Sequence, residues 1–291
     1  MIISQLSGGL GNQMFQYAAA YALADHLGVE CKADVTVFQR NVRKYELAVF
    51  AGAPVIARPS DIPFPYRQGN YRLRRLVARI VGPVKLGELT IFNERSPFVF
   101  DDRFFQADKH TYLIGYFQTE RYFVRCADKI RQIYDFVPRP DHRNQALLDR
   151  IRSTNAVSVH VRRGDYVTNP QYNKHHGTCS LEYYQEAFAT VMGRVDHPSF
   201  YVFSDDPDWA AGNVKPPAEA VYAYHNRGDA SYEDMRLMAN CRHNIIANSS
   251  FSWWAAWLNA NPDKIVVAPK RWLASQQLEV RDLIPTRWFQ C

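Results

Sequence analysis

The chain has 291 residues, of which 47% are hydrophobic and 22% are charged. This composition is typical of a globular protein and excludes a disordered chain, and the length suffices for two domains. The net charge of +6 fits a solvated basic surface or a partner that carries phosphate, such as a nucleotide, a nucleic acid or an anionic membrane.

The spacing of the cysteines and the sequence of the N-terminus favour a cytoplasmic protein. The five cysteines are widely spaced and form no CxxC pair, so we expect neither a zinc site nor a redox motif. The start, MIISQLSGGLGNQ, lacks the basic and apolar regions of a signal peptide. No stretch approaches the roughly 20 apolar residues of a membrane helix. We therefore expect a bacterial-type cytoplasmic protein.

The N-terminal region predicts a β-turn-α-β opening. An apolar strand is expected over residues 1–7, followed by a glycine-rich turn. Residues 12–27 predict a helix that is apolar on nearly every side and therefore buried. Gly28 is expected to end this helix, and residues 29–35 predict the next strand.

The following region is less regular. Residues 40–110 hold many prolines without clean periodicity, which predicts loops and short helices. Within them, residues 67–79 carry five arginines among apolar residues. A solvated helix face is the favoured interpretation of this stretch, and peripheral association with the inner membrane is the alternative. Residues 110–117 predict a strand, and residues 120–133 a helix.

A Pro-rich segment at residues 137–140 predicts a linker, and strands alternate with helices after it. The predicted helices are 141–152, 180–194, 231–241 and 251–259; the predicted strands are 156–161, 200–203, 220–224, 244–247 and 265–268. This alternation indicates an α/β fold with a parallel sheet covered by helices on both faces. We expect two Rossmann-like domains, residues 1–137 and 138–291, facing a central cleft, with ligands beyond the carboxyl ends of the strands.

Several helix starts carry capping signals. Ser180 is a candidate N-cap, and Ser231 with Asp234 has the spacing of a capping box. Asp206 stands before Pro207, which is the arrangement of an N-cap followed by proline at the first helical position.

The strongest site signal is HVRRGDY at residues 160–166. Adjacent arginines at a strand end, beside a glycine, form an anion clamp, because one guanidinium group donates two parallel hydrogen bonds to phosphate oxygens. Strand alternation puts His160 and Arg162 on one face, toward the site. Arg163 points the other way, where Asp165 or another carboxylate would pair with it.

Two further strand ends carry polar residues. After residue 203, Asp205 is a candidate for a metal site or for hydrogen bonds to ribose or base; the metal is disfavoured because arginines already neutralise a diphosphate. After residue 247, Ser249 and Ser250 open a helix. This placement predicts helix capping, an anion site, or both.

At the N-terminus, Gly8, Gly9 and Gly11 precede Asn12 between a strand and a helix. Such a turn lets the backbone approach phosphate, although it matches neither GxGxxG nor a Walker loop. Asn12 alternatively is an ordinary helix N-cap. Trp253, Trp254 and Trp257 are expected to serve packing rather than ligand stacking.

Five motifs occur together and in order: GGLGNQMFQYA at the start, GYFQTERYF at 115–123, HVRRGDY at 160–166, FSDD at 203–206 and ANSSFSWWAAWL at 247–258. On these motifs the chain resembles the bacterial α-1,2-fucosyltransferases, which are glycosyltransferases of family 11 related to the blood-group H enzymes. The resemblance spans most of the chain.

The resemblance implies a GT-B-like fold and an inverting transfer from GDP-fucose that needs no metal and no cofactor. The partners would be GDP-fucose and a galactose-terminated glycan, with no nucleic acid, in surface polysaccharide or O-antigen synthesis. The acceptor-side domain would be residues 1–137, and the GDP-fucose-binding domain residues 138–291.

The roles implied for individual residues follow the motifs. Arg162 would bind the β-phosphate and stabilise departing GDP, with His160 on the nucleotide and Asp165 orienting Arg162. Ser249 and Ser250 would meet the diphosphate, and Asp205 would assist nucleotide binding. The loop of Gly9, Gly11 and Asn12 would close over the diphosphate.

The sequence leaves the general base and the linkage open. Asp165 is the first candidate base; Asn12 would orient groups, and His175 and His176 are expected to be solvated. The alternatives to an α-1,2 linkage are an α-1,6 or O-fucosyl linkage. A further alternative is a nucleotide-sugar or glycan-binding protein without turnover.

Overall fold

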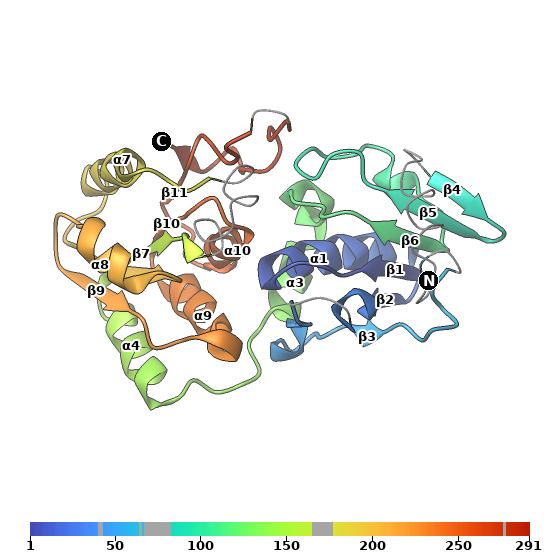
Figure 1. Ribbon diagram of the computed structural model, residues 1–291, viewed down its shortest axis with the longest axis horizontal. Helices are drawn as coiled ribbons and strands as arrows, with labels where there is room; N and C mark the ends of the chain where they lie inside the picture. Colours follow the sequence, from blue (N-terminus) through green and yellow to red (C-terminus); the bar gives the residue numbers. More distant parts are fainter. Residues whose placement is uncertain (40–42, 64–65, 67–82, 165–176, 276–277) are drawn as a thin grey trace. The chain divides into compact units, whose positions relative to one another are not determined.

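The computed structural model describes residues 1–39, 43–63, 66, 83–164, 177–275 and 278–291. The chain forms two compact units (Figure 1). The first contains residues 1–137 and 279–285, and the second contains residues 138–278 and 286–291. The segment 279–285 therefore returns to the first unit after the chain has passed through the second. The basic stretch at 67–79 lies outside the described residues.

The first unit is built on a six-stranded sheet with the order β3-β2-β1-β6-β5-β4. Its strands are β1 (Ile2–Gln5), β2 (Cys31–Asp34), β3 (Val55–Ile56), β4 (Pro83–Leu86), β5 (Leu89–Asn93) and β6 (Thr111–Ile114). All pairs are parallel except β4 with β5. The chain order reverses between β1 and β6, and ligands of open α/β sheets bind beyond the strand ends at such a switch point.

Helix α1 (Leu10–Leu27) fills the interior of this unit, as its apolar sequence predicts. It packs against strands β1 and β2. It also contacts the short turns η2 (Leu47–Val49), η4 (Phe104–Gln106) and η5 (Glu120–Tyr122), so that nearly all of its residues are buried. Gly28 ends the helix in the left-handed conformation, which confirms the predicted stop. The predicted start is wrong: the helix begins at Leu10 with Gly9 as N-cap, so Asn12 lies within the first turn.

The Pro-rich region contains strands that its sequence does not signal. Strands β4 and β5 form a hairpin around Gly87, which has a φ of 65°. Pro83 opens β4 at the sheet edge, where its missing N–H is tolerated. The helix predicted over 120–133 is instead two tight turns, η5 and η6 (Val124–Cys126), followed by α3 (Ala127–Ile133).

The returning segment is anchored to the first unit by Asp282. Its carboxylate accepts the N–H of Phe100 at 2.9 Å and pairs with Arg121 at 3.0 Å. Its own N–H donates to the carbonyl of Phe98 at 3.2 Å. Residues close to the C-terminus therefore help to hold the middle of the first unit.

The second unit contains an all-parallel sheet with the order β12-β11-β10-β7-β8-β9. Its strands are β7 (Asn155–Val161), β8 (Pro198–Ser204), β9 (Ala220–Ala223), β10 (His243–Ile245), β11 (Val266–Ala268) and β12 (Phe289–Gln290). This is the Rossmann order, and its switch point lies between β7 and β10.

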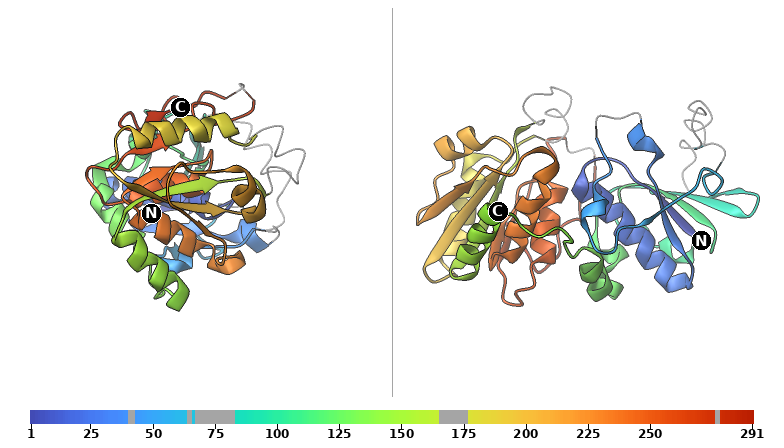
Figure 2. Two further views of the ribbon diagram at one scale, coloured as in Figure 1. Left: turned by 90° about the vertical axis from the view of Figure 1, so that its left-hand side faces the viewer. Right: turned by 90° about the horizontal axis from the view of Figure 1, so that it is seen from below.

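Helices cover both faces of the second sheet, which confirms the predicted α/β layering (Figure 2). One layer contains α4 (His142–Arg152), α9 (Tyr232–Asn240) and α10 (Ser250–Leu258), and the other α7 (Leu181–Met192) and α8 (Pro207–Asn213). Val157, Val159 and Val161 pack in the α7–α8 core. In the described residues, no helix combines the length and apolar character that crossing a bilayer requires.

Candidate functional site

Asp205 organises the strand ends at β7 and β8. Its Oδ2 lies 2.9 Å from Nη1 of Arg162, and its Oδ1 accepts the backbone N–H of Arg163 at 2.8 Å. A Cβ added at Gly164 would lie 2.6 Å from Oδ2 of Asp205, so a side chain at this position would disturb the pair. Asp205 therefore positions Arg162 at the carboxyl edge of the sheet.

Arg163 has a different environment, as strand alternation predicts. Its Nε pairs with Oδ2 of Asp206 at 3.3 Å, and its guanidinium lies 3.7 Å from the ring centroid of Trp209. Asp206 also accepts the N–H of Trp209 as N-cap of α8, which confirms the capping prediction. Arg163 thus pairs with a carboxylate other than Asp165 and packs against α8.

His160 lies under this edge and is only 5% exposed. Strand alternation turns it toward α10, where its ring centroid is 5.8 Å from that of Phe251. Burial lowers the pKa of His160 to about 4; Asp205 opposes this shift, and Arg162 adds to it. The imidazole is therefore neutral near pH 7, and its Nδ1 has no hydrogen-bond partner among the described residues.

Helix α10 begins after β10, at the switch point between β7 and β10. Ser249 is the N-cap and accepts the N–H of Phe251 at 3.4 Å, which confirms the capping interpretation, and Ser250 is the first residue of the helix. Asn248 fixes the preceding loop by donating to the carbonyls of Gly177 and Trp272, each at 3.1 Å. A fixed helix start at a strand end presents N–H groups that are able to bind an anion.

The three tryptophans of α10 are buried and contact one another. Trp253 and Trp254 are 0% exposed and Trp257 is 1% exposed, with ring centroids of Trp253 and Trp254 5.3 Å apart. The packing interpretation of these residues is confirmed.

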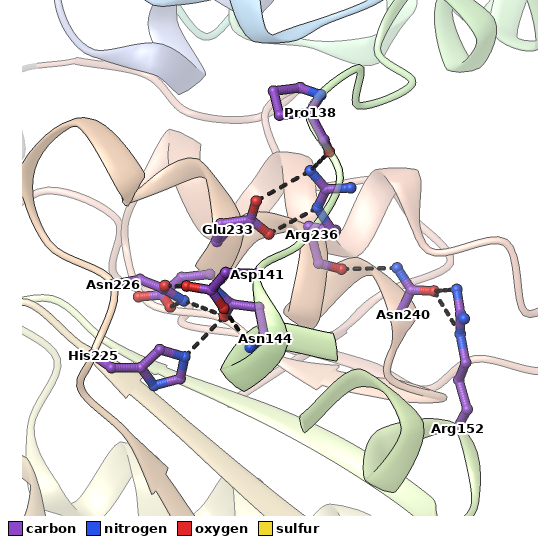
Figure 3. A network of polar contacts seen from close by, with 10 residues as sticks. Pro138, Asp141, Asn144, Arg152, His225, Asn226, Glu233, Arg236 and Asn240 are labelled. Carbon is purple, nitrogen blue, oxygen red and sulfur yellow. Dashed lines mark hydrogen bonds and ion pairs between the residues drawn. The ribbon is translucent and has the colours of Figure 1, made fainter. Parts of the chain in front are cut away.

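A polar network at the same edge contains residues that sequence reasoning missed (Figure 3). Asn144 and Asn226 exchange side-chain hydrogen bonds at 2.8 and 2.9 Å, and Nε2 of His225 lies 2.9 Å from Oδ1 of Asn144. Asn226 also donates to Asp234 at 2.8 Å. Helices α4 and α9 precede β7 and β10, so their N-termini and the loop after β9 lie at the carboxyl edge.

Asp234 is a half-buried acid of this network. Burial raises its pKa to about 7; the hydrogen bond from Asn226 lowers it, and Glu233 raises it further. The predicted capping box is wrong, because Ser231 makes no side-chain cap bond and the carboxylate of Asp234 binds Asn226 instead. Ligands of α/β sheets bind beyond the carboxyl ends of the strands. Inspection of residues 224–227, which follow β9, would therefore have identified His225 and Asn226 from the sequence.

The glycine-rich loop lies at the switch point of the first sheet. Gly9 caps α1 without a side chain, Gly11 is buried within its first turn, and Oδ1 of Asn12 accepts from Gln118 at 2.7 Å. Gln13 donates to the carbonyls of Gly8 and Lys44 at 2.9 and 2.8 Å, and it accepts the N–H of Glu46 at 2.9 Å. The buried side chain of Gln13 therefore fixes the glycine-rich loop against residues 44–46.

The structure places the predicted site residues in two groups. The second unit brings His160, Arg162 and Asp205 together at neighbouring strand ends with Ser249 and Ser250. The first unit holds Gly9, Gly11 and Asn12. Asp165, His175 and His176 lie outside the described residues.

The buried neutral His160 predicts an acid-sensitive fold. Its contribution to stability is fully present above its ordinary pKa of 6.5 and is lost as the pH falls toward 4. We expect His160→Asn to lose less free energy of unfolding than wild type over this interval, by on the order of 1–3 kcal/mol. Urea denaturation at several pH values measures the difference. Exposed His110, changed to Asn, is the control, and equal pH dependence in His160→Asn and wild type would contradict the prediction.

Comparison with known proteins identifies the family. The sequence profile described as glycosyl transferase family 11 matches residues 96–290. An Escherichia coli alpha-1,2-colitosyltransferase is 31% identical over 100% of this chain and 98% of that protein. The chain belongs to glycosyl transferase family 11. The resemblance seen in the sequence motifs is thereby confirmed, and the protein is a glycosyltransferase.

Other relatives of this family 11 enzyme include bacterial and mammalian proteins. The O-antigen biosynthesis glycosyltransferase WbnK of Escherichia coli is 30% identical over 93% of this chain and 94% of its own length. A galactoside alpha-(1,2)-fucosyltransferase 1 from Lagothrix lagotricha is 24% identical over 90% of this chain and 66% of its own length.

Solved structures identify the fold as GT-B-like, as expected from the resemblance. POFUT1 in complex with GDP-fucose matches with a TM-score of 0.52 at 12% identity, over 92% of this chain and 97% of that chain. Arabidopsis thaliana FUT1 in complex with GDP matches with a TM-score of 0.50 at 12% identity, over 92% and 70%.

Proposed function

We propose that this family 11 enzyme transfers L-fucose from GDP-β-L-fucose to the 2-hydroxyl of a β-galactoside, with inversion and without a metal ion. The observation that carries the proposal is the Arg162–Asp205 pair, held at 2.9 Å at the carboxyl ends of β7 and β8. The names of the mammalian relatives support the donor and the linkage. The name of WbnK supports a role in O-antigen synthesis.

Arg162 supplies the electrostatic part of the reaction. The glycosidic bond to GDP breaks with growing positive charge on the sugar and growing negative charge on the β-phosphate. A positioned guanidinium binds these oxygens more tightly as the charge grows, which lowers the barrier. The start of α10 at Ser249 and Ser250 adds backbone donors to the same diphosphate.

We infer that the base of the nucleotide contacts the polar network at Asp234. A carboxylate accepts the N1–H and the 2-amino group of guanine together, whereas adenine offers no such adjacent donors. Asp234 is held by Asn226 at the same sheet edge as Arg162. His160, which is 5% exposed beneath this edge, is proposed to contact the nucleotide.

In this proposal the first unit binds the acceptor, and its loop of Gly9, Gly11 and Asn12 contributes to substrate binding. Asp165 is proposed as the base that takes the proton of the acceptor hydroxyl. Asn12 orients groups, because an amide has no useful basicity at neutral pH.

A second donor is favoured by one observation. The relative at 31% identity bears the name alpha-1,2-colitosyltransferase, and colitose is L-fucose without its 3-hydroxyl. A site that does not hydrogen-bond the 3-hydroxyl accepts both sugars, whereas a site that does bind it rejects the deoxy sugar strongly. A direct comparison of the two GDP-sugars separates the cases.

Incubation with GDP-fucose and a panel of β-galactosides, with and without EDTA, tests the proposal. We expect an α-1,2-fucosylated product at an unchanged rate in EDTA, with the linkage measured by NMR. GDP release without a glycoside product would indicate a different acceptor. An α-1,6 product, or a rate abolished by EDTA and restored by a divalent ion, would contradict the proposed linkage or metal independence.

A further inference from the structure

The segment Gly115–Gln118 follows β6 at the switch point of the first sheet, and its backbone is held by the side chains of Glu94 and Gln16. The carboxylate of Glu94, which follows β5, accepts the N–H of Tyr116 at 2.7 Å and the N–H of Phe117 at 2.9 Å. Burial raises the pKa of Glu94 to about 8, against the lowering effect of both N–H groups. The anchor therefore carries an electrostatic cost that the rest of the fold offsets.

Two amide side chains connect this segment to the glycine-rich loop and α1. Gln16 donates to the carbonyl of Gly115 at 2.9 Å and accepts the N–H of Ser7 at 2.8 Å. Gln118 donates to Asn12 at 2.7 Å. The loops that follow β1 and β6, on either side of the switch point, are thus held in one arrangement.

The backbone conformation of the segment is unusual. Phe117 has a φ of 53°, a left-handed conformation that a bulky residue adopts only when its surroundings enforce it. Its ring is fully buried, with centroids 5.6 Å from Phe104 and 5.3 Å from Tyr122. A Cβ at Gly115 would lie 2.4 Å from Cβ of Glu94.

Between these fixed residues, the side chain of Tyr116 is 41% exposed. A single exposed aromatic side chain is ordinary on a protein surface. This one differs because both neighbouring residues are constrained and its own N–H is held by the half-buried carboxylate of Glu94. A strained residue and a half-buried acid therefore fix a segment that presents an aromatic ring where α/β sheets bind ligands.

We propose that Tyr116 is an acceptor-binding residue whose ring stacks on the apolar face of a galactose unit. The C–H groups at C3, C4 and C5 of β-galactose form that face, and an aromatic ring fixed in advance binds it at a small entropic cost. The inference rests on the proposed function, because it names the part of the acceptor site that recognises the sugar.

Steady-state kinetics with variants of Tyr116 tests this role. We expect Tyr116→Ala to raise the acceptor KM about tenfold or more, with an unchanged KM for GDP-fucose and an unchanged free energy of unfolding. Tyr116→Phe is expected to retain the wild-type acceptor KM, because stacking does not need the hydroxyl. The matched control is Phe289→Ala: Phe289 is also 41% exposed, but it lies on β12 of the other sheet and is expected to leave both KM values unchanged.

The affinity for GDP-fucose, measured by calorimetry on the same proteins, distinguishes a failure of the proposed role of Tyr116 from a failure of the proposed function. Wild-type protein that binds no GDP-fucose would contradict the proposed function. Normal donor binding together with a wild-type acceptor KM in Tyr116→Ala would contradict only the role of Tyr116. A rise in the acceptor KM that Tyr116→Phe shares with Tyr116→Ala would also overturn stacking, since it would indicate a hydrogen bond from the hydroxyl.

Discussion

Replacing Arg162 with alanine is expected to lower kcat about 100- to 1,000-fold, the usual cost of removing one donor that stabilises transition-state charge. The fold is expected to survive, because Asp205 keeps its hydrogen bond from the N–H of Arg163. Initial rates of GDP release and transfer, measured beside urea denaturation, check both parts. Near-normal turnover in this variant would contradict the assignment of Arg162.

The structure offers two comparisons for this experiment. Arg162→Lys keeps a positive charge but loses the paired donors of the guanidinium, so we expect activity between wild type and Arg162→Ala. Arg150→Ala removes an exposed ion pair with Glu219, in which the side chains are 49% and 60% exposed. It is expected to change neither the rate nor the stability appreciably.

Replacing Gln13 with alanine is expected to lower the free energy of unfolding by about 3 kcal/mol. The side chain is 0% exposed and makes three hydrogen bonds, with Gly8, Lys44 and Glu46. The variant leaves these backbone groups without their partner and opens a cavity beside the glycine-rich loop. Chemical denaturation measures the loss.

A matched control for this prediction is Gln145→Ala. Gln145 is also helical, but it is exposed and makes one side-chain hydrogen bond, to Asp149 at 2.8 Å. We expect a change of less than about 0.5 kcal/mol there. An equal loss in both variants would show that Gln13 contributes through helix propensity rather than through its buried contacts.

Features set by local spacing were predictable from the sequence. Capping by Ser180, Asp206 and Ser249 depends on residues two or three positions apart, and alternation along β7 separates the environments of Arg162 and Arg163. Alternating strands and helices were sufficient to predict the parallel sheet of the second unit.

Features that depend on distant residues were not predictable. The strand expected over 110–117 ends at Ile114, because the carboxylate of Glu94 binds the N–H groups of Tyr116 and Phe117. Likewise, Asp234 binds Asn226 rather than the start of its own helix, and Asn226 is held by Asn144 from a third element. The hydrophobic periodicity of one segment contains no information about hydrogen-bond partners on other elements.

The return of residues 279–285 to the first unit has a consequence for protein engineering. A gene fragment that encodes residues 1–137 would lack Asp282 and its bonds to Phe98, Phe100 and Arg121. A fragment that stops at 285 would leave β11 without its neighbour β12. Chimeras that exchange one unit between family 11 enzymes therefore need three crossover points, after residues 137, 278 and 285, and a single crossover at the linker would combine mismatched parts.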